Sequence, residues 1–435
     1  MLPRACGPTL RFAQRNRAHW LRTFATATEL DAAIAQATSD PYRRVPQAVV
    51  MAATSADSRL YVGKGGYARL PPRPPLNADS LDETAVPVSE HSVFELYSCT
   101  KLVAAIATLQ LVEQGHLRLD DDASSYVPEL REAKIYRGWT TGGELVLEEN
   151  RTTITVRMLL THTAGFAYYT HDPAVLQIAD ALGIRPMPYA YGAKKTWLTE
   201  MPLMAEPGAR FVYGTSNDWL TLVVEAVSCE PLEDYFQQHI FRPLRIDDMS
   251  YLPNANQISM AHADRSEPNR PHRIRPPDRM SETQHYGGAG LRGSPASFLR
   301  ILRALLRRGE LDGAQILRAE TVDSIFHNQM RPGTQQESLE AYVRHNIDFT
   351  SGNGYGLGGA LDGARLRSEG VGDELTWSGV ANTFWSIDRK RDLAFVVFSN
   401  LTPFGTRHIR DLYTNARSAL RRGVGTQTGS AMSVR

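Results

Sequence analysis

Only one serine in the chain is followed by a lysine three residues later: Ser98 precedes Lys101 in a Ser-x-x-Lys motif. Residues three apart at the start of a helix lie on one face, so the hydroxyl and the amine can meet. A buried lysine can act as a base and activate the hydroxyl for covalent catalysis. The alternative is that Ser98 only caps the helix and Lys101 extends into solvent. Two observations support the catalytic interpretation and leave the alternative open. The chain has only six lysines, and this one opens a strongly apolar helix, where an idle charge would be unfavourable.

A second candidate is Tyr213, in a Tyr-Gly-x-x-x-Asp-Trp segment that follows a Glu-Pro-Gly turn. A tyrosine on this loop can present its hydroxyl to a cleft, while Asp218 caps the helix that we predict over 218–227. The alternative is that Tyr213 is a core aromatic, because aromatic side chains usually serve packing.

A third candidate segment precedes a predicted hairpin and consists of Trp377, Ser378, Gly379 and Val380. Small residues here let an edge strand approach a ligand closely, and a backbone N–H can complete an oxyanion hole. A β-bulge is the alternative explanation for Gly379.

Other motifs narrow the chemistry. No His-Glu-x-x-His or other metal-ligand spacing occurs, so we interpret His162 as a structural or capping residue and expect neither a metal nor a cofactor. No Gly-x-Ser-x-Gly elbow occurs either, which argues against an α/β-hydrolase.

Hydrophobic periodicity predicts the elements that must position these residues. We expect strands at 47–53, 60–63, 383–387 and 393–398, and helices at 102–112, 156–162, 218–227, 232–241, 297–308 and after Pro403. Strands therefore lie at both ends and helices in the middle. This order predicts an α+β fold in which an antiparallel sheet of N- and C-terminal strands is flanked by helices, with a mostly helical subdomain at roughly 110–300.

Composition excludes several classes of protein. The 435 residues are 42% hydrophobic with a net charge of +1, which is ordinary globular composition without a basic field for nucleic acid. No apolar run approaches the roughly 20 residues of a membrane helix. The three cysteines fit neither a disulfide framework nor a metal site, which favours a reducing compartment.

Residues 1–28 form a segment of their own, with five arginines and no acid before Glu29. This composition suits a mitochondrial presequence, although a disordered or docked terminus is the alternative. We expect a mitochondrial or cytoplasmic protein, not a secreted one. A catalytic domain is expected over 29–425 and a disordered tail over 426–435.

Together the motifs resemble the serine β-lactamase and penicillin-binding-protein superfamily, in its class C-like branch, over about residues 30–420. The resemblance rests on an ordered set: Ser98-x-x-Lys101, Leu-Leu-Thr-His-Thr-x-Gly at 159–165, the Glu-Pro-Gly turn, Tyr213, Phe241-x-Pro243-Leu244, Gly287-Gly288-x-Gly290, Tyr355-Gly356-Leu357-Gly358 and the final hairpin. The Tyr-Gly-x-x-x-Asp-Trp segment is more similar to family VIII carboxylesterases and to fungal polyketide-pathway acyltransferases of the lovastatin side-chain type. True β-lactamases would show Tyr-x-Asn and Lys-Thr-Gly, where this chain has Thr215 and Trp377-Ser378-Gly379.

The resemblance implies roles for individual residues. Ser98 would be the nucleophile, and Lys101 and Tyr213 would share the general base and acid work. The N–H groups of Ser98 and Val380 would form the oxyanion hole. Substrate would contact Trp377, Gly379 and Phe404, the last in a place where related acyltransferases have an aromatic pocket residue.

The function expected from this resemblance is a serine acyltransferase or esterase of small-molecule, secondary metabolism. Its partners would be a small-molecule acyl donor, an acyl-carrier protein or other thioester as a further donor, and an alcohol or water as acceptor. The alternative is a non-catalytic, structural member of the same fold. Retention of Ser98, Lys101 and Tyr213 together argues against that alternative.

Overall fold

The computed structural model describes residues 25–71, 85–169, 172–184, 196–264, 266–267, 270–275, 285–346 and 353–424. Residues 1–24 and the tail expected at 426–435 lie outside these ranges. A helix over 25–37 includes residues 25–28, which the sequence had assigned to the N-terminal segment. The folded part of the chain therefore extends at least to residue 25.

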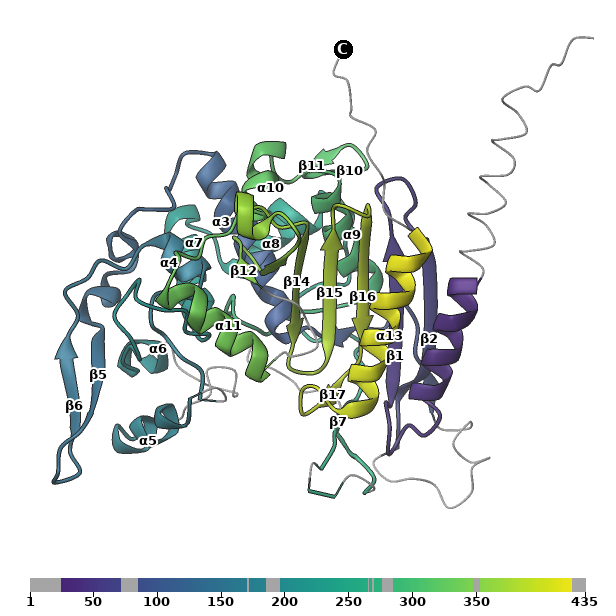
Figure 1. Cartoon of the computed structure of the whole chain (residues 1–435), viewed down its shortest axis with the longest axis horizontal. Helices are drawn as coiled ribbons and strands as arrows, with labels where there is room; N and C mark the ends of the chain where they lie inside the picture. The colour runs from purple at the N-terminus through teal and green to yellow at the C-terminus, as the bar shows by residue number, and fades with distance from the viewer. Residues whose placement is uncertain are drawn as a thin grey trace, which may run out of the picture.

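Both ends of the chain contribute to one antiparallel sheet, as the sequence predicts (Figure 1). Among the described residues it has eight strands, in the order β12-β13-β14-β15-β16-β1-β2-β3. Their bounds are β12 Gly354–Tyr355, β13 Ala360–Asp362, β14 Glu374–Gly379, β15 Thr383–Asp388, β16 Leu393–Phe398, β1 Gln47–Ala53, β2 Tyr61–Arg69 and β3 Val86–Pro87. β1 is central: Val50 lies opposite Gly63 of β2 and Val397 of β16.

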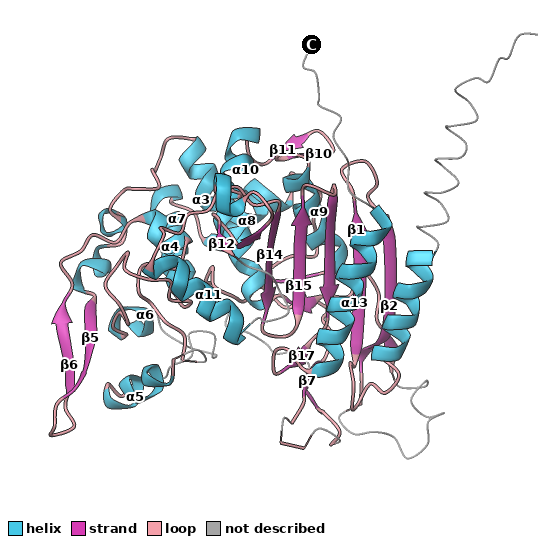
Figure 2. Ribbon diagram, in the orientation of Figure 1, coloured by secondary structure: helices cyan, strands magenta, loops and turns pink. Residues whose placement is uncertain are grey.

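β1 is buried on both faces, which explains its unbroken apolar sequence. Val49 and Met51 belong to the main core, which also contains apolar side chains of helix α9 (Pro295–Leu306). Val50 and Ala52 point to the opposite face, which the helix over 25–37 and α13 (Arg407–Val424) cover. Figures 1 and 2 show these two helices side by side in front of the sheet.

The rest of the molecule is mostly helical. Its main helices are α3 Thr100–Glu113, α4 Val156–Leu160, α5 Pro173–Ala181, α6 Thr196–Glu200, α7 Ser216–Ser228, α8 Leu232–Phe236, α10 Ala319–Ile325, α11 Thr334–Asn346 and α12 Leu366–Glu369. Twelve of the fourteen residues of α3 are buried, because other elements surround the helix. This burial on all sides matches its sequence, which has apolar residues all around the helix. Beyond its last turn Gly115 adopts φ +76°, the left-handed conformation expected of a glycine after a helix.

Several short elements were not predicted. They are the β5 Lys134–Trp139 and β6 Leu145–Glu149 hairpin, β17 Leu401–Thr402 with β7 Met260–His262 and β8 Arg273–Arg275, β10 Glu310–Leu311 with β11 Ala314–Gln315, and β9 Arg292–Gly293. The partner of β9 is β4 Phe94–Glu95, where the sequence predicts a short strand or extended piece at 94–97. The helix predicted over 232–241 has the predicted bounds, but only α8, which ends at Phe236, is α-helical, and a π-helical segment continues to Phe241. The middle of the chain is therefore mostly, not wholly, helical.

A buried carboxylate ties the start of β14 to α13. The Glu374 side chain is 2% exposed and is surrounded by donors. It accepts hydrogen bonds from Ser386 Oγ at 2.6 Å and from Arg417 Nη2 at 2.6 Å, and it also pairs with Arg421. Removing one member of such a buried network leaves the others uncompensated.

We expect Glu374→Gln to lower the free energy of unfolding by about 3–5 kcal/mol, because Arg417 and Arg421 lose their shared carboxylate. Urea denaturation followed by tryptophan fluorescence measures this loss. The control is Glu29→Gln, which breaks the exposed pair with Arg422 and should change stability by less than about 1 kcal/mol. Equal losses in the two variants would contradict a structural role for the buried network.

Candidate active site

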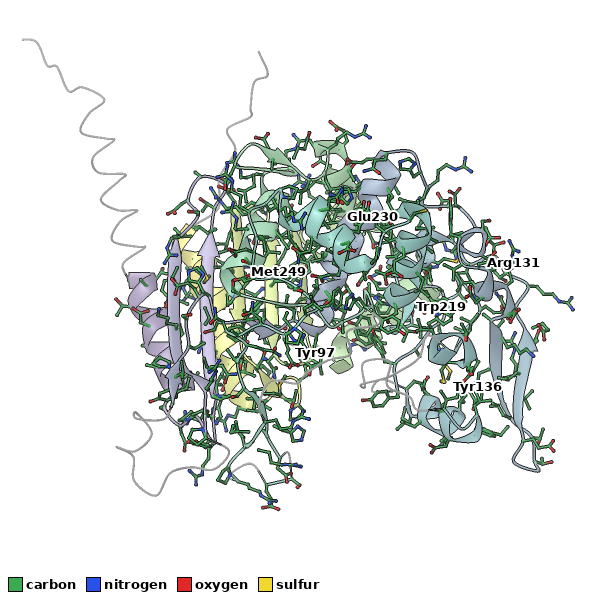
Figure 3. The ribbon with its side chains drawn as sticks, turned by 180° about the vertical axis from the view of Figure 1, so that it is seen from behind. Tyr97, Arg131, Tyr136, Trp219, Glu230 and Met249 are labelled. Carbon is green, nitrogen blue, oxygen red and sulfur yellow. The ribbon has the colours of Figure 1, made fainter. Side chains whose placement is uncertain are left out.

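Ser98 lies where the chain turns from β4 into α3. It is the middle residue of a 3₁₀ turn, Tyr97–Cys99, that leads directly into α3. Tyr97 adopts φ +46°, a left-handed conformation that non-glycine residues rarely take. Figure 3 shows Tyr97 between the sheet and the helical part of the molecule. Backbone conformations of this kind concentrate at functional sites, where the surrounding structure enforces them.

Lys101 lies one helical turn after Ser98 and is buried, with 2% of the residue exposed. Its Nζ is 3.2 Å from Ser98 Oγ, 3.1 Å from the Tyr168 hydroxyl and 2.7 Å from the Gly288 carbonyl oxygen. The proximity predicted from the Ser-x-x-Lys spacing is therefore present. An alternative in which Lys101 extends into solvent is wrong.

Tyr213 lies beside the same lysine, just before α7. Lys101 Nζ is 4.9 Å from the centre of the Tyr213 ring, and the Tyr213 hydroxyl accepts a hydrogen bond of 3.1 Å from Trp377 Nε1. Because an indole N–H can only donate, the hydrogen of the Tyr213 hydroxyl points elsewhere. Tyr213 is buried like a core aromatic, yet its hydroxyl belongs to a polar contact between the helical part and the sheet.

Aromatic rings surround Tyr213. Tyr342 of α11 lies 5.2 Å from it and stacks on Trp377, while Tyr355 packs edge-on behind Trp377. Burial raises the pKa of Tyr342 and of Tyr355 well above the usual range of a phenol. Both hydroxyls therefore stay protonated at neutral pH.

His162 is also part of this aromatic cluster. Its ring centre lies 4.7 Å from that of Tyr213, and its Nδ1 accepts a 3.4 Å hydrogen bond from the Gly214 N–H. These contacts and its complete burial fit the interpretation of His162 as a structural residue.

Cys99, the neighbour of Ser98, points away from solvent into the main core. Burial raises the pKa of its thiol to about 12. A protonated, buried thiol is a poor nucleophile, so Cys99 does not compete with the Ser98 hydroxyl.

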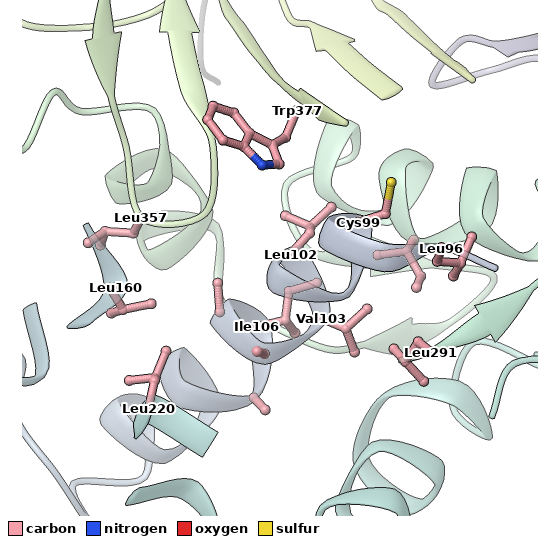
Figure 4. Close-up of a cluster of buried hydrophobic side chains, with 14 of the residues drawn as sticks. Leu96, Cys99, Leu102, Val103, Ile106, Leu160, Leu220, Leu291, Leu357 and Trp377 are labelled. Carbon is pink, nitrogen blue, oxygen red and sulfur yellow. The ribbon is translucent and has the colours of Figure 1, made fainter. Parts of the chain in front are cut away.

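The end of β14 forms the other side of the site. In the described residues β13 pairs only with Glu374–Thr376, so the last three residues of β14 have a partner strand on one side alone. Figure 4 shows Trp377 above the start of α3. At Gly379 a Cβ atom would lie 2.3 Å from the Leu96 carbonyl oxygen, so only glycine allows this close approach to the Ser98 turn. Gly379 pairs regularly with Thr383, which excludes the bulge considered above.

Two predicted residues have a less direct relation to this cluster. Val380 begins the turn after β14, and its side chain is exposed. Phe404 packs on Phe384, with ring centres 5.6 Å apart, near the face of the sheet that α13 covers. The oxyanion role of the Val380 N–H and the substrate contact of Phe404 stay predictions.

The prediction that Asp218 caps α7 is wrong, because the helix begins at Ser216 and Asp218 lies within its first turn. Asp218 instead accepts a hydrogen bond of 3.0 Å from the Gly288 N–H. Sequence reasoning also missed Tyr168 and the Gly288 carbonyl as partners of Lys101. The only available signal was that both lie in or just after segments of the family resemblance, at 159–165 and 287–290.

Within the described ranges, no group of three or more His, Cys, Asp or Glu side chains is arranged to hold a metal ion. The helices described in the structure also include none with the length and hydropathy needed to cross a bilayer.

Comparison with known proteins shows which family this arrangement belongs to. The Beta-lactamase family model matches residues 33–419. Monacolin J acid methylbutanoyltransferase of Aspergillus terreus is 30% identical over 396 residues, which cover 85% of this chain and 90% of the relative. Lovastatin esterase of Penicillium rubens is 31% identical, over 70% of this chain and 78% of the relative.

Comparison with solved structures points to the same family. A mutant of simvastatin synthase from Aspergillus terreus has a TM-score of 0.77 and 28% identity, covering 91% of this chain and 96% of that one. With a family match across nearly all of the folded part, and relatives that transfer or hydrolyse acyl groups, the chain belongs to the β-lactamase family, among its acyltransferases and carboxylic-ester hydrolases.

Proposed function

We propose that the protein forms an acyl-enzyme on Ser98 and passes the acyl group to an alcohol, with water as a competing acceptor. The observation that carries the proposal is the 3.2 Å contact between Ser98 Oγ and the buried Lys101 Nζ. Small-molecule donors and acceptors of secondary metabolism are the substrate class, as the names of the relatives suggest. An acyl-carrier protein or other thioester is proposed as a further donor.

The proposed first half-reaction begins at the contact between Lys101 and Ser98. Lys101 takes the Ser98 proton while Oγ attacks the carbonyl carbon of the donor. The resulting oxyanion is held by the backbone N–H groups of Ser98 and Val380. Tyr213 donates its hydroxyl proton to the leaving oxygen or sulfur and regains a proton from Lys101. The bond to the leaving group breaks and an ester on Ser98 remains.

The second half-reaction runs in the opposite direction. Tyr213 and Lys101 take the proton of the acceptor hydroxyl as its oxygen attacks the Ser98 ester. The same N–H groups hold the second oxyanion. Collapse releases the new ester, or an acid when water attacks, and the proton returns to Ser98 Oγ.

A panel of p-nitrophenyl esters and acyl thioesters, with and without alcohol acceptors, tests this proposal. We expect release of p-nitrophenol or thiol, and a new ester when an alcohol is present. A serine-directed phosphonate should add one adduct to the intact mass. Neither turnover nor an adduct would favour the non-catalytic alternative.

β-Lactams should be poor substrates, because Trp377 stands where the β-lactamase motif has a lysine. Loss of a charge-assisted bond to the substrate carboxylate removes about 1.5–3 kcal/mol, so we expect nitrocefin kcat/KM to be about 10- to 100-fold or more below that for a p-nitrophenyl ester. Spectrophotometric assays of the two substrates measure the ratio. Comparable values would contradict the esterase-like specificity.

A further inference from the structure

The Asp218 carboxylate lies behind the catalytic lysine and has no place in the reaction described so far. The residue is fully buried, with 0% exposed. Its Oδ1 accepts a hydrogen bond of 3.0 Å from the Gly288 N–H, and its Oδ2 accepts a longer one of 3.4 Å from the Tyr168 hydroxyl. A carboxylate buried to this extent is unfavourable unless the surroundings compensate for its lost hydration.

The two residues that Asp218 contacts are the two that hold Lys101. Lys101 Nζ lies 2.7 Å from the Gly288 carbonyl oxygen and 3.1 Å from the Tyr168 hydroxyl oxygen. One carboxylate from α7 therefore contacts both of these partners of the amine. Tyr168, Gly288 and Asp218 come from three separate parts of the chain.

The directions of these hydrogen bonds follow from what each group can donate. An ionised carboxylate only accepts, so the Tyr168 hydroxyl donates to Asp218 and its oxygen accepts from Lys101. The Gly288 carbonyl also only accepts. The proposed base role requires Lys101 in its neutral form. With both N–H bonds of that amine directed at Tyr168 and Gly288, its lone pair would face the third neighbour, Ser98 Oγ, which lies 3.2 Å away. That is the orientation a base needs.

We propose that Asp218 is a positioning residue that fixes the Tyr168 hydroxyl as an acceptor and thereby directs the lone pair of Lys101 at Ser98. This inference rests on the proposed function, because it assigns a purpose to Asp218 only if Lys101 is the base. After proton transfer the same carboxylate lies near the lysine ammonium and stabilises it.

The test compares Asp218→Asn, Tyr168→Phe and the double variant. An asparagine keeps the shape and an acceptor for the Gly288 N–H, but its NH₂ group cannot accept from Tyr168. We expect kcat for a p-nitrophenyl ester to fall about 10- to 100-fold in each single variant, with KM within about twofold, since a misdirected base affects the chemical step. Because Asp218 acts through Tyr168, the double variant should be no slower than Tyr168→Phe.

Thr221→Val is the matched control. Thr221 lies on the same helix, and its Oγ1 accepts a 2.9 Å hydrogen bond from the Gly287 N–H, in the same loop as Gly288. The valine removes this bond, and also the 2.9 Å bond that Thr221 Oγ1 donates to the Asp218 backbone carbonyl oxygen. It keeps the Asp218 carboxylate itself, so kcat should stay within about threefold of wild type. A loss equal to that of Asp218→Asn would mean that Asp218 is only structural, and the proposal would be wrong.

Other outcomes also decide the question. A kcat of Asp218→Asn within threefold of wild type, or losses that multiply in the double variant, would overturn the proposal. If Asp218→Asn does not fold, the result for Tyr168→Phe is decisive. An unchanged kcat in Tyr168→Phe would reject the proposal that Asp218 orients Lys101 through the Tyr168 hydroxyl. Ser98→Ala distinguishes a failure of the proposed function from a failure of this inference about Asp218. Turnover that persists in Ser98→Ala rejects the proposed function. An inactive Ser98→Ala together with a fully active Asp218→Asn rejects only the inference about Asp218.

Discussion

Replacing Ser98 by alanine is expected to abolish acyl-enzyme formation, with a loss of kcat on the order of 10⁶-fold. The change removes one oxygen atom from a partly buried side chain, so the fold should persist. Without the hydroxyl there is no atom to carry the acyl group, and only binding and the oxyanion hole could assist direct hydrolysis. Intact mass after incubation with a serine-directed phosphonate provides the measurement.

Ser216→Ala is the control for this experiment. Ser216 is fully buried at the start of α7, three residues after Tyr213, and its hydroxyl lacks a hydrogen-bond partner in the described structure. The same chemical change at this position should leave adduct formation intact. A labelled adduct on the Ser98→Ala protein would refute the assignment of the nucleophile.

Loss of Lys101 or of Tyr213 should produce nearly the same residual rate as loss of both. In the proposed mechanism the two residues share one proton path, and both lie at the site, with Lys101 Nζ 3.2 Å from Ser98 Oγ and 4.9 Å from the Tyr213 ring centre. We expect Lys101→Met and Tyr213→Phe each to lower kcat by about 100-fold or more. The double variant should not be the product of the two losses, because either change already interrupts the path. Initial rates with one p-nitrophenyl ester, measured at a single pH, give all three values.

Tyr355→Phe is the matched change for Tyr213→Phe. Tyr355 is 1% exposed, packs behind Trp377 and keeps its hydroxyl protonated. Removing this hydroxyl should leave kcat within about threefold of wild type. A similarly small effect of Tyr213→Phe would mean that Tyr213 only packs in the core, and the acid–base assignment would then be withdrawn.

The sequence was sufficient to predict those features of the fold and site that depend on residues close together in the chain. Ser98 and Lys101 are one helical turn apart, so their contact follows from helix geometry alone. β1 was predicted with its observed bounds because a short apolar run between polar ends is typical of a strand covered on both faces. The placement of strands at both ends of the chain predicted that they share one antiparallel sheet, whereas the pairing of β1 with β16 is known only from the structure.

The sequence was insufficient where the site depends on contacts between distant segments. Asp218 was assigned to the helix cap because aspartate at a helix start usually accepts from its own backbone. In the structure the loop at Gly288 supplies a competing N–H, and no local pattern encodes that loop's approach. The bond from Trp377 to Tyr213 likewise joins residues 164 apart in the chain. Motif spacing identifies reactive residue types, whereas tertiary packing determines which neighbours orient them.

The central position of β1 has a consequence for how the protein is synthesised. β1 is made early, but its neighbour β16 is made late: Val49 pairs with Phe398. Until β16 leaves the ribosome, one edge of a strand that is apolar from Ala48 to Ala53 has no partner, and such edges promote aggregation. Pairings this distant in sequence also slow folding. Early burial of one face of β1 by the helix over 25–37 would not cover this edge. We therefore expect a chain that ends before Leu393 to be insoluble.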